Sequence, residues 1–231
     1  MERLRVLALV CCLVLAGCSA PGIGSLGSSN DDLGNVAAND TLDERHGGAL
    51  AAATNFSYDA NLSTPESSER LDAAIQRDPS VSLTRIVTGP LETTQFSNAS
   101  GTYIRGEQNG SVAYKYDAGR SRVDGFATAA IPFNATYERN GSTTIDGVPV
   151  ARFEARNASE DLTLGGYARL GVQNFSATLA VTADGLVKRA SWRVDTPAGT
   201  YAYNGTYSAL GATSVETPEW VSEVNTSDAQ E

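Results

Sequence analysis

The chain has few of the residues that usually carry catalysis or bind metals. Its 231 residues include three cysteines and one histidine, His46. Zinc sites of the usual kind need two or more histidine or cysteine ligands, and a serine–histidine arrangement would depend wholly on His46, which we expect on the surface. Phosphate-binding loops, nucleophile elbows and EF-hand loops are also missing. We therefore predict no catalytic site, no cofactor and no metal site, and a protein that is not an enzyme.

Carboxylate pairs are the remaining candidates for catalysis, because two carboxylic acids can catalyse glycoside hydrolysis. Asp31-Asp32 and Glu160-Asp161 are such neighbours. With 27 acidic residues in the chain, adjacent acids are expected by chance, and a solvated surface explains them better. One basic pair, Arg120 and Arg122, could contact an anionic headgroup, but a solvated strand end is the preferred interpretation.

Positive charge is scarce as well. The net charge is −10, and the lysines are Lys115 and Lys188 alone. A negative surface repels phosphate backbones, which argues against nucleic-acid binding. Few lysines, many acids and abundant small residues favour a halophilic protein, whose hydrated acidic surface stays soluble when salt screens charge. Ordinary drift towards acidity is the alternative.

The first eighteen residues carry the strongest signal in the sequence. Two arginines precede an apolar run, Val6–Leu15, and Leu15-Ala16-Gly17-Cys18 ends it. This order predicts a secretory signal over residues 1–17, because a membrane span needs about 20 apolar residues. The last four residues resemble the lipobox of prokaryotic lipoproteins. The resemblance implies that Cys18 is lipidated on its sulfur and becomes the first mature residue. The alternative is an ordinary secretory signal in which Cys18 is incidental.

A lipid on Cys18 would place the protein on the outer face of the cytoplasmic membrane. Cys11 and Cys12 lie inside the apolar run and would leave with the signal. The mature protein would then have neither a free thiol nor a disulfide. Membrane contact would come from the anchor, since no polybasic patch is present.

Three further parts follow along the chain. Residues 18–40 are rich in Gly, Ser, Asn and Asp, which predicts a flexible tether. Gly22–Gly27 matches G-x-G-x-x-G, but it lacks the flanking strand and helix of a dinucleotide site. Residues 41–221 have the size of one domain, and residues 222–231 predict a disordered acidic tail.

Asparagine is concentrated in one motif. Eleven of the thirteen asparagines begin Asn-x-Ser/Thr, whereas chance would give roughly two or three such acceptors. The excess favours export and N-glycosylation outside the cell. Asn39 and Asn225 flank the predicted domain. The candidate sites within it are Asn55, Asn61, Asn98, Asn109, Asn134, Asn140, Asn157, Asn174 and Asn204.

The domain begins with a predicted helix, Leu42–Ala53. Asn55–Leu62 alternates apolar and polar residues, which predicts a half-buried strand. Between Thr64-Pro65 and Asp78-Pro79 we expect a second short helix, because Leu71 and Ile75 are four residues apart.

The remainder has mostly strand patterns. Asn109-Gly110 and Asp146-Gly147 each join two such patterns, which predicts hairpins. Asn174–Leu210 predicts a three-stranded antiparallel meander with one apolar face. Gly125–Tyr137 predicts a short helix or an irregular crossing, and Asp161–Gly171 a helix or a loop. Val215 and residues 218–221 are expected to dock the C-terminus.

Two segments carry a resemblance to known families. Ala183-Asp184-Gly185-Leu186-Val187 and the run Ser208–Pro218 resemble haloarchaeal surface lipoproteins of unassigned function and, more distantly, LolA-like and LppX/LprG-like lipoproteins. The resemblance implies an α+β fold: a curved, half-closed antiparallel sheet with a few short helices covering its open side. Those families hold lipids or lipidated proteins in the hollow and offer no fixed catalytic residues.

A single sheet with one apolar face needs a cover, and two or three short helices would leave part of that face to line a cavity. We expect a membrane-anchored, non-catalytic lipoprotein outside the cytoplasm that binds or carries lipid or another apolar ligand. The alternative is a structural or interaction lipoprotein of the cell envelope, with a filled core and no ligand cavity.

Overall fold

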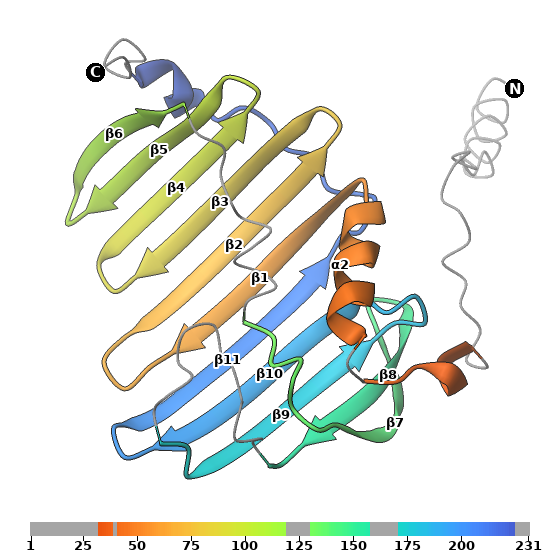
Figure 1. Cartoon of the computed structure of the whole chain (residues 1–231). Helices are drawn as coiled ribbons and strands as arrows, with labels where there is room; N and C mark the ends of the chain where they lie inside the picture. The colour runs from red at the N-terminus through yellow and green to blue at the C-terminus, as the bar shows by residue number, and fades with distance from the viewer. Residues whose placement is uncertain (1–31, 39–40, 119–129, 158–170, 225–231) are drawn as a thin grey trace, which may run out of the picture.

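The computed structural model describes residues 32–38, 41–118, 130–157 and 171–224. Eleven strands form one antiparallel sheet in the order β6-β5-β4-β3-β2-β1-β11-β10-β9-β8-β7 (Figure 1). The strands are β1 (Asn55–Ser63), β2 (Ser68–Arg77), β3 (Ser80–Thr88), β4 (Leu91–Asn98), β5 (Gly101–Gln108), β6 (Ser111–Asp117), β7 (Glu138–Ile145), β8 (Val148–Ala155), β9 (Asn174–Val181), β10 (Val187–Thr196) and β11 (Gly199–Ser208).

Helices are few among the described residues. They are the α-helix α2 (Leu42–Ala52) and the 3₁₀ helices η1 (Asp32–Asn35) and η2 (Glu219–Glu223). β1 pairs with β11 in the middle of the sheet, and β6 and β7 lie at opposite edges, so the sheet stays open. An open antiparallel sheet with few helices confirms the predicted fold class.

The β-hairpins and the late meander were predicted correctly. Asn109 and Asp146 have φ of 51° and 50°, and each is followed by a glycine with φ near 80°. Two consecutive left-handed residues give the two-residue turn that matches the twist of the flanking strands. In the meander, β9, β10 and β11 pair in sequence order.

The predicted second helix is wrong. Residues Ser68–Arg77 form β2, which pairs with β1 over its whole length. Leu71 and Ile75 share a face at a spacing of four residues in either structure, since four is also a multiple of two. Ala73 is buried between them, which completes the alternation of a strand.

The ends of the domain also differ from expectation. Leu33 and Val36 are buried in the main core, so residues 32–38 belong to the domain and not to the tether. At the other end Val224 is buried, which places the start of the acidic tail after residue 224. The remaining tether and tail lie outside the described residues, as does most of Asp161–Gly171.

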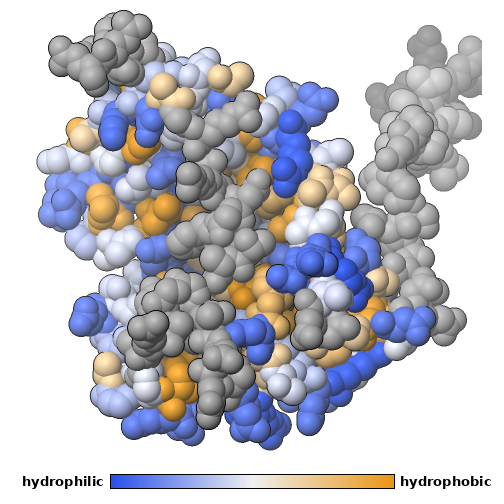
Figure 2. Space-filling model, in the orientation of Figure 1, coloured by the Kyte–Doolittle hydropathy of each residue, from blue (hydrophilic) through white to orange (hydrophobic). Residues whose placement is uncertain are grey.

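The core lies on the face of the sheet that α2 covers, called the α2 face below. Leu42, His46 and Leu50 of the helix are buried against it. Residues 130–137 cross the same face without regular structure, with Ile131 buried in the core. Figure 2 views this face and shows hydrophobic residues gathered across its middle and hydrophilic residues along its rim. The opposite side of the sheet is called the outer face.

Candidate ligand-binding face

The α2 face is organised in rows that cross the strands. One row runs through Leu179, Ala190, Gly205, Ala60 and Leu71, which are direct partners on β9, β10, β11, β1 and β2. Its three central members are small. Because opposed residues on one face lie close together, small side chains in adjacent strands leave space above the sheet.

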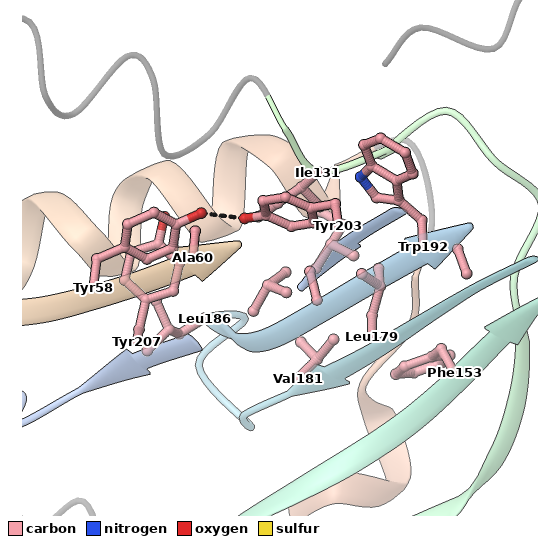
Figure 3. Close-up of a cluster of buried hydrophobic side chains, with 14 of the residues drawn as sticks. Tyr58, Ala60, Ile131, Phe153, Leu179, Val181, Leu186, Trp192, Tyr203 and Tyr207 are labelled. Carbon is pink, nitrogen blue, oxygen red and sulfur yellow. Dashed lines mark hydrogen bonds between the residues drawn. The ribbon is translucent and has the colours of Figure 1, made fainter. Parts of the chain in front are cut away.

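Two tyrosines from neighbouring rows fill that space. Tyr58 and Tyr203 reach over the row of small residues, and their hydroxyl groups form a short hydrogen bond (Figure 3). A Cβ atom at Gly205 would collide with Tyr203 Oη and lie 2.8 Å from Tyr58 Oη. Gly205 therefore allows two phenol oxygens to meet in the middle of an apolar surface.

Aromatic rings surround the hydroxyl pair. The Tyr207 ring lies 4.6 Å from that of Tyr58, and Trp192 stacks on Tyr203 at 5.7 Å. Trp192 Nε1 donates a hydrogen bond to the carbonyl oxygen of Ala130 at 2.7 Å, which fastens the crossing segment to the face. Burial raises the pKa of Tyr203 to about 12 and raises that of Tyr58 as well, so both phenols stay protonated.

His46 was expected on the surface, and this expectation is wrong. The side chain is fully buried, with Phe133 and Tyr207 packed against the ring. The backbone N–H of Val187 donates to Nδ1 at 3.2 Å, so the ring proton lies on Nε2. Burial lowers the pKa of His46 to about 4, which keeps the ring neutral at pH 7. A helix position near the presumed tether gave no sign that this side faces the core.

The α2 face changes character beyond β2. Thr84, Gln95 and Ile104 continue one row across β3, β4 and β5, and Ser82, Ser97 and Thr102 continue another. Ser97 and Thr102 share a hydrogen bond of 2.9 Å between their hydroxyl groups. The face therefore has an apolar half over β8–β11, β1 and β2, and a hydroxyl-rich half over β3–β5. Alternation in the sequence did not reveal this change.

A hollow lies on β7 and β8. Its volume is about 470 Å³, and its lining residues are Thr136, Glu138, Arg139, Asn140, Glu154, Arg156 and Asn157. Asn140 donates to Glu154 Oε1 at 2.6 Å across it. Every one of these lining residues is polar or charged, so the hollow does not suit the apolar ligand that the sequence predicted.

The candidate glycosylation sites are mostly accessible. Asn61, Asn109, Asn134, Asn140, Asn157, Asn174 and Asn204 are exposed. Asn61 and Asn204 are direct partners on β1 and β11. Asn55 and Asn98 are half-buried, and their side-chain oxygens accept backbone hydrogen bonds from Thr213 and Ser100. Asn39 and Asn225 lie outside the described residues.

The other predicted sites are not brought together. Cys18, Arg120, Arg122 and Glu160-Asp161 lie outside the described residues. Across the described ranges, no group of three or more His, Cys, Asp or Glu side chains is placed to hold a metal ion. Within the same ranges, no helix combines the length and the apolar character that crossing a membrane requires.

The structure thus defines a class of protein: an open, single-sheet domain whose helix-covered face carries an aromatic and apolar surface. Residues 3–224 match the model of a family of unknown function, DUF7537, and the chain belongs to this family. The matched residues include the apolar run Val6–Leu15 and Cys18. No curated protein matches the chain.

Two solved structures are similar to this chain. Lipoprotein LppX of Mycobacterium tuberculosis is 13% identical, with 83% of this chain and 100% of that chain covered and a TM-score of 0.46. A putative outer membrane lipoprotein-sorting protein domain from Vibrio parahaemolyticus is 8% identical, with 78% and 96% covered and a TM-score of 0.26.

Proposed function

We propose that the protein is a non-catalytic carrier or binding protein for lipid or another apolar molecule, with the α2 face as its binding surface. The observation that carries the proposal is the apolar half of that face. It gathers Phe56, Tyr58, Trp192 and Tyr203, and the two tyrosines reach over a row of small residues. Ligand sites in proteins are mostly lined by apolar and aromatic side chains with a few placed polar groups, and this surface has both.

We propose further that Cys18 anchors the protein by a lipid to the outer face of the cytoplasmic membrane, and that exposed sequons carry N-glycans. The leader and the Leu-Ala-Gly-Cys motif support the anchor. The acidic composition gives no second, basic membrane signal, so stable attachment would need two lipid chains on this residue.

The binding function is tested by native mass spectrometry of the full chain purified without detergent. We expect a co-purifying apolar molecule. Ile86 and Val87 offer a matched pair, because they are adjacent, half-buried and on opposite faces of β3. Ile86→Glu places a charge on the α2 face and should abolish the adduct, whereas Val87→Glu on the outer face should keep it.

A chain that folds and carries no apolar molecule, even after incubation with lipid vesicles, would contradict the carrier function. That result would favour a structural or interaction protein of the envelope. An adduct that survives Ile86→Glu and disappears with Val87→Glu would place the binding surface on the outer face, which would contradict the proposed site.

The anchor is tested by cell fractionation. Cys18→Ser should move the exported protein from the membrane to the soluble fraction, because the anchor sulfur is lost. Met1 retained on a protein found in the cytosol would contradict export. Membrane association that withstands high-salt washing in the exported Cys18→Ser variant would contradict the anchor.

A further inference from the structure

The polar hollow on β7 and β8 is bordered by two candidate glycosylation sites. Asn140 begins Asn140-Gly141-Ser142 and Asn157 begins a second Asn-x-Ser, and both side chains line the hollow. The other candidate asparagines of the domain are not among its lining residues. The hollow therefore combines space for a polar ligand with a point at which a sugar could be attached.

Asn140 directs its amide into this hollow. The pairing of β7 with β8 shifts register between Arg139 and Ser142, and Gly141 has φ of 78°. A bulge of this kind re-aims a side chain away from the regular alternation. Asn140 Nδ2 donates to Glu154 Oε1 at 2.6 Å across the hollow, so the nitrogen that would carry a glycan lies inside it.

Attachment of a sugar to this nitrogen conserves the hydrogen bond. The glycosylating enzyme takes the sugar from a donor in which C1 is bound to a phosphate. The C1–O bond breaks with its electron pair going to the phosphate, C1 bonds to Asn140 Nδ2, and one of the two amide protons is released. The other proton still donates to Glu154. Because C1 is bonded directly to Nδ2, the first sugar begins in the hollow.

The lining suits the hydroxyl groups of a sugar, which both donate and accept hydrogen bonds. Glu138 and Glu154 supply acceptors, and Arg139 and Arg156 supply donors. The two carboxylates and the two guanidinium groups balance, so the lining does not favour an ion of either sign. The volume of about 470 Å³ lies within the range of ligand sites, ~300–1,000 Å³.

Two carboxylates face each other on this edge of the sheet. Glu138 and Glu154 are direct partners on β7 and β8, and like charges directly opposite each other are destabilising. Guanidinium nitrogens of Arg152 and Arg156 each lie 3.6 Å from a carboxylate oxygen of Glu154, which relieves one of the two acids. Hydroxyl groups placed between the carboxylates would donate to both, so a bound sugar would turn an unfavourable pair into two strong acceptors.

We propose that the hollow on β7 and β8 is the seat of the first sugars of an N-glycan on Asn140, held against the sheet by the carboxylates and guanidinium groups of the lining. The inference rests on the proposed glycosylation of exposed sequons, and it names the site and the contacts of one glycan. β7 is an edge strand whose residues are all exposed except Ile145 (Figure 1). An unpaired edge is open to pairing with another chain, and a glycan seated here would shield that edge.

Amide hydrogen exchange of the full chain tests this seat. The chain is exported from a host that N-glycosylates and, for comparison, is produced in a host that does not. Glycopeptide mass spectrometry measures the occupancy of Asn140 in the first preparation. Ser142→Ala removes this sequon and keeps Asn140. Ser111→Ala is the matched control, because both serines are exposed on edge strands and Ser111 completes the sequon of Asn109.

In the glycosylated preparation we expect a glycan on Asn140. Ser142→Ala should then speed the exchange of the amides that pair β7 with β8 by about threefold or more, because the seated sugars no longer hold this edge. Ser111→Ala should leave these amides unchanged. In the unglycosylated preparation Ser142→Ala should have no effect, because there is no glycan to lose.

Glu138→Ala tests the lining and should act differently in the two preparations. Without the glycan it removes a carboxylate that faces Glu154, so exchange between β7 and β8 should not become faster. With the glycan it removes an acceptor for sugar hydroxyl groups, so the same exchange should become about twofold faster.

An unmodified Asn140 beside other, glycosylated sequons would overturn the inference. A glycan on Asn140 whose loss leaves exchange in β7 and β8 unchanged would also overturn it, as would faster exchange in both preparations of Ser142→Ala. Protection that is lost in Asn157→Gln and kept in Ser142→Ala would give the seat to the other asparagine. Absence of glycan from every sequon would overturn the proposed glycosylation as well, whereas the carrier function depends on none of these results.

Discussion

The two halves of this sheet share one pairing pattern but bury different kinds of side chain on the α2 face. Around β8–β11, β1 and β2, large side chains such as Tyr58, Leu179 and Trp192 are buried on the α2 face. In β4 the buried aromatic is Phe96, on the outer face, where its ring lies 6.2 Å from that of Tyr103. The corresponding α2-face positions of β3–β5 are mainly hydroxyl and amide residues.

The difference shows that a continuous sheet does not require a continuous core. Strand pairing is made by the backbone, so it runs unbroken through all eleven strands. Burial depends on what covers each face. The side-chain period of two lets the apolar set move to the other face without a break in register. The α2 face is therefore apolar at one end and hydroxyl-rich at the other.

The outer face has a cover of its own, which begins on β1 and β2 and reaches β6. Thr213 Oγ1 shares a hydrogen bond with Ser57 Oγ at 3.0 Å, and the N–H of Val215 donates to Gln76 Oε1 at 3.2 Å. Trp220 then stacks on Tyr114 of the edge strand β6, and Tyr114 donates to Glu223. The C-terminal segment thus docks as predicted, and Figure 1 shows it running along the ends of the strands to η2 beside β6.

The largest expected effect is the loss of a large side chain from the apolar half. Leu179→Ala should lower the free energy of unfolding by about 3–5 kcal/mol, because Leu179 is fully buried and its removal leaves a cavity. Leu83→Ala, at a half-buried position on the outer face of β3, should cost about 1–2 kcal/mol. Denaturant unfolding measures both, and equal losses would remove the energetic distinction between the halves.

Low pH should lower the free energy of unfolding through protonation of His46, which is buried in the apolar half. Its pKa is about 4 in the folded protein and 6.5 in the unfolded chain, so the unfolded chain binds the proton first as pH falls. Stability is therefore fully present above pH 6.5 and declines towards pH 4, by about 3 kcal/mol for a difference of about 2.5 pKa units. His46→Leu should remove this component from the pH profile between 6.5 and 5. A variant whose profile matches that of the natural chain would show that another group is responsible.

Two glycines allow the two halves to be compared directly, because Gly205 and Gly106 lie in the same row on the α2 face. The row connects them through Ala60, Leu71, Ile86 and Thr93. Gly205→Ala should cost about 1–3 kcal/mol, since the new Cβ displaces the Tyr58–Tyr203 pair. Gly106→Ala meets nothing within 4 Å and should stabilise the chain by about 0.5 kcal/mol. Thermal melting distinguishes them, and similar losses would show that both halves are equally crowded.

The smallest effect is expected at the outer cover. Trp220→Ala should cost about 1 kcal/mol through loss of the stack on Tyr114. Trp220→Phe keeps an aromatic ring and should be nearly neutral. Denaturant unfolding followed by circular dichroism compares the two. A large loss for Trp220→Ala would mean that the C-terminal segment is part of the main core.

The sequence predicted those elements whose signals are local. The Asn109-Gly110 and Asp146-Gly147 turns specify their own backbone, and the alternation in Asn55–Leu62 specifies a strand. The helix predicted around Leu71 and Ile75 was wrong because their spacing fits a helix and a strand equally well. The exposed position predicted for His46 was wrong because one residue on a short helix gives no periodicity from which a buried face can be inferred.

The candidate site was less predictable than the fold. The tyrosines were recognised as strand residues, but nothing in the spacing of Tyr58 and Tyr203, or in Gly205 itself, indicates that two hydroxyls meet above a glycine. Such a pair depends on the register between β1 and β11, which are far apart in the chain. The change from apolar to hydroxyl-rich rows also appears only when the strands are aligned.

By itself the sequence determined the turns, the strand alternation and the acidic composition, because each depends on neighbouring residues or on sums over the chain. Tertiary structure decided which side of each strand is buried, where the single histidine lies and which two tyrosine hydroxyls meet above Gly205. These properties depend on register and cover between distant segments, and no local pattern encodes them.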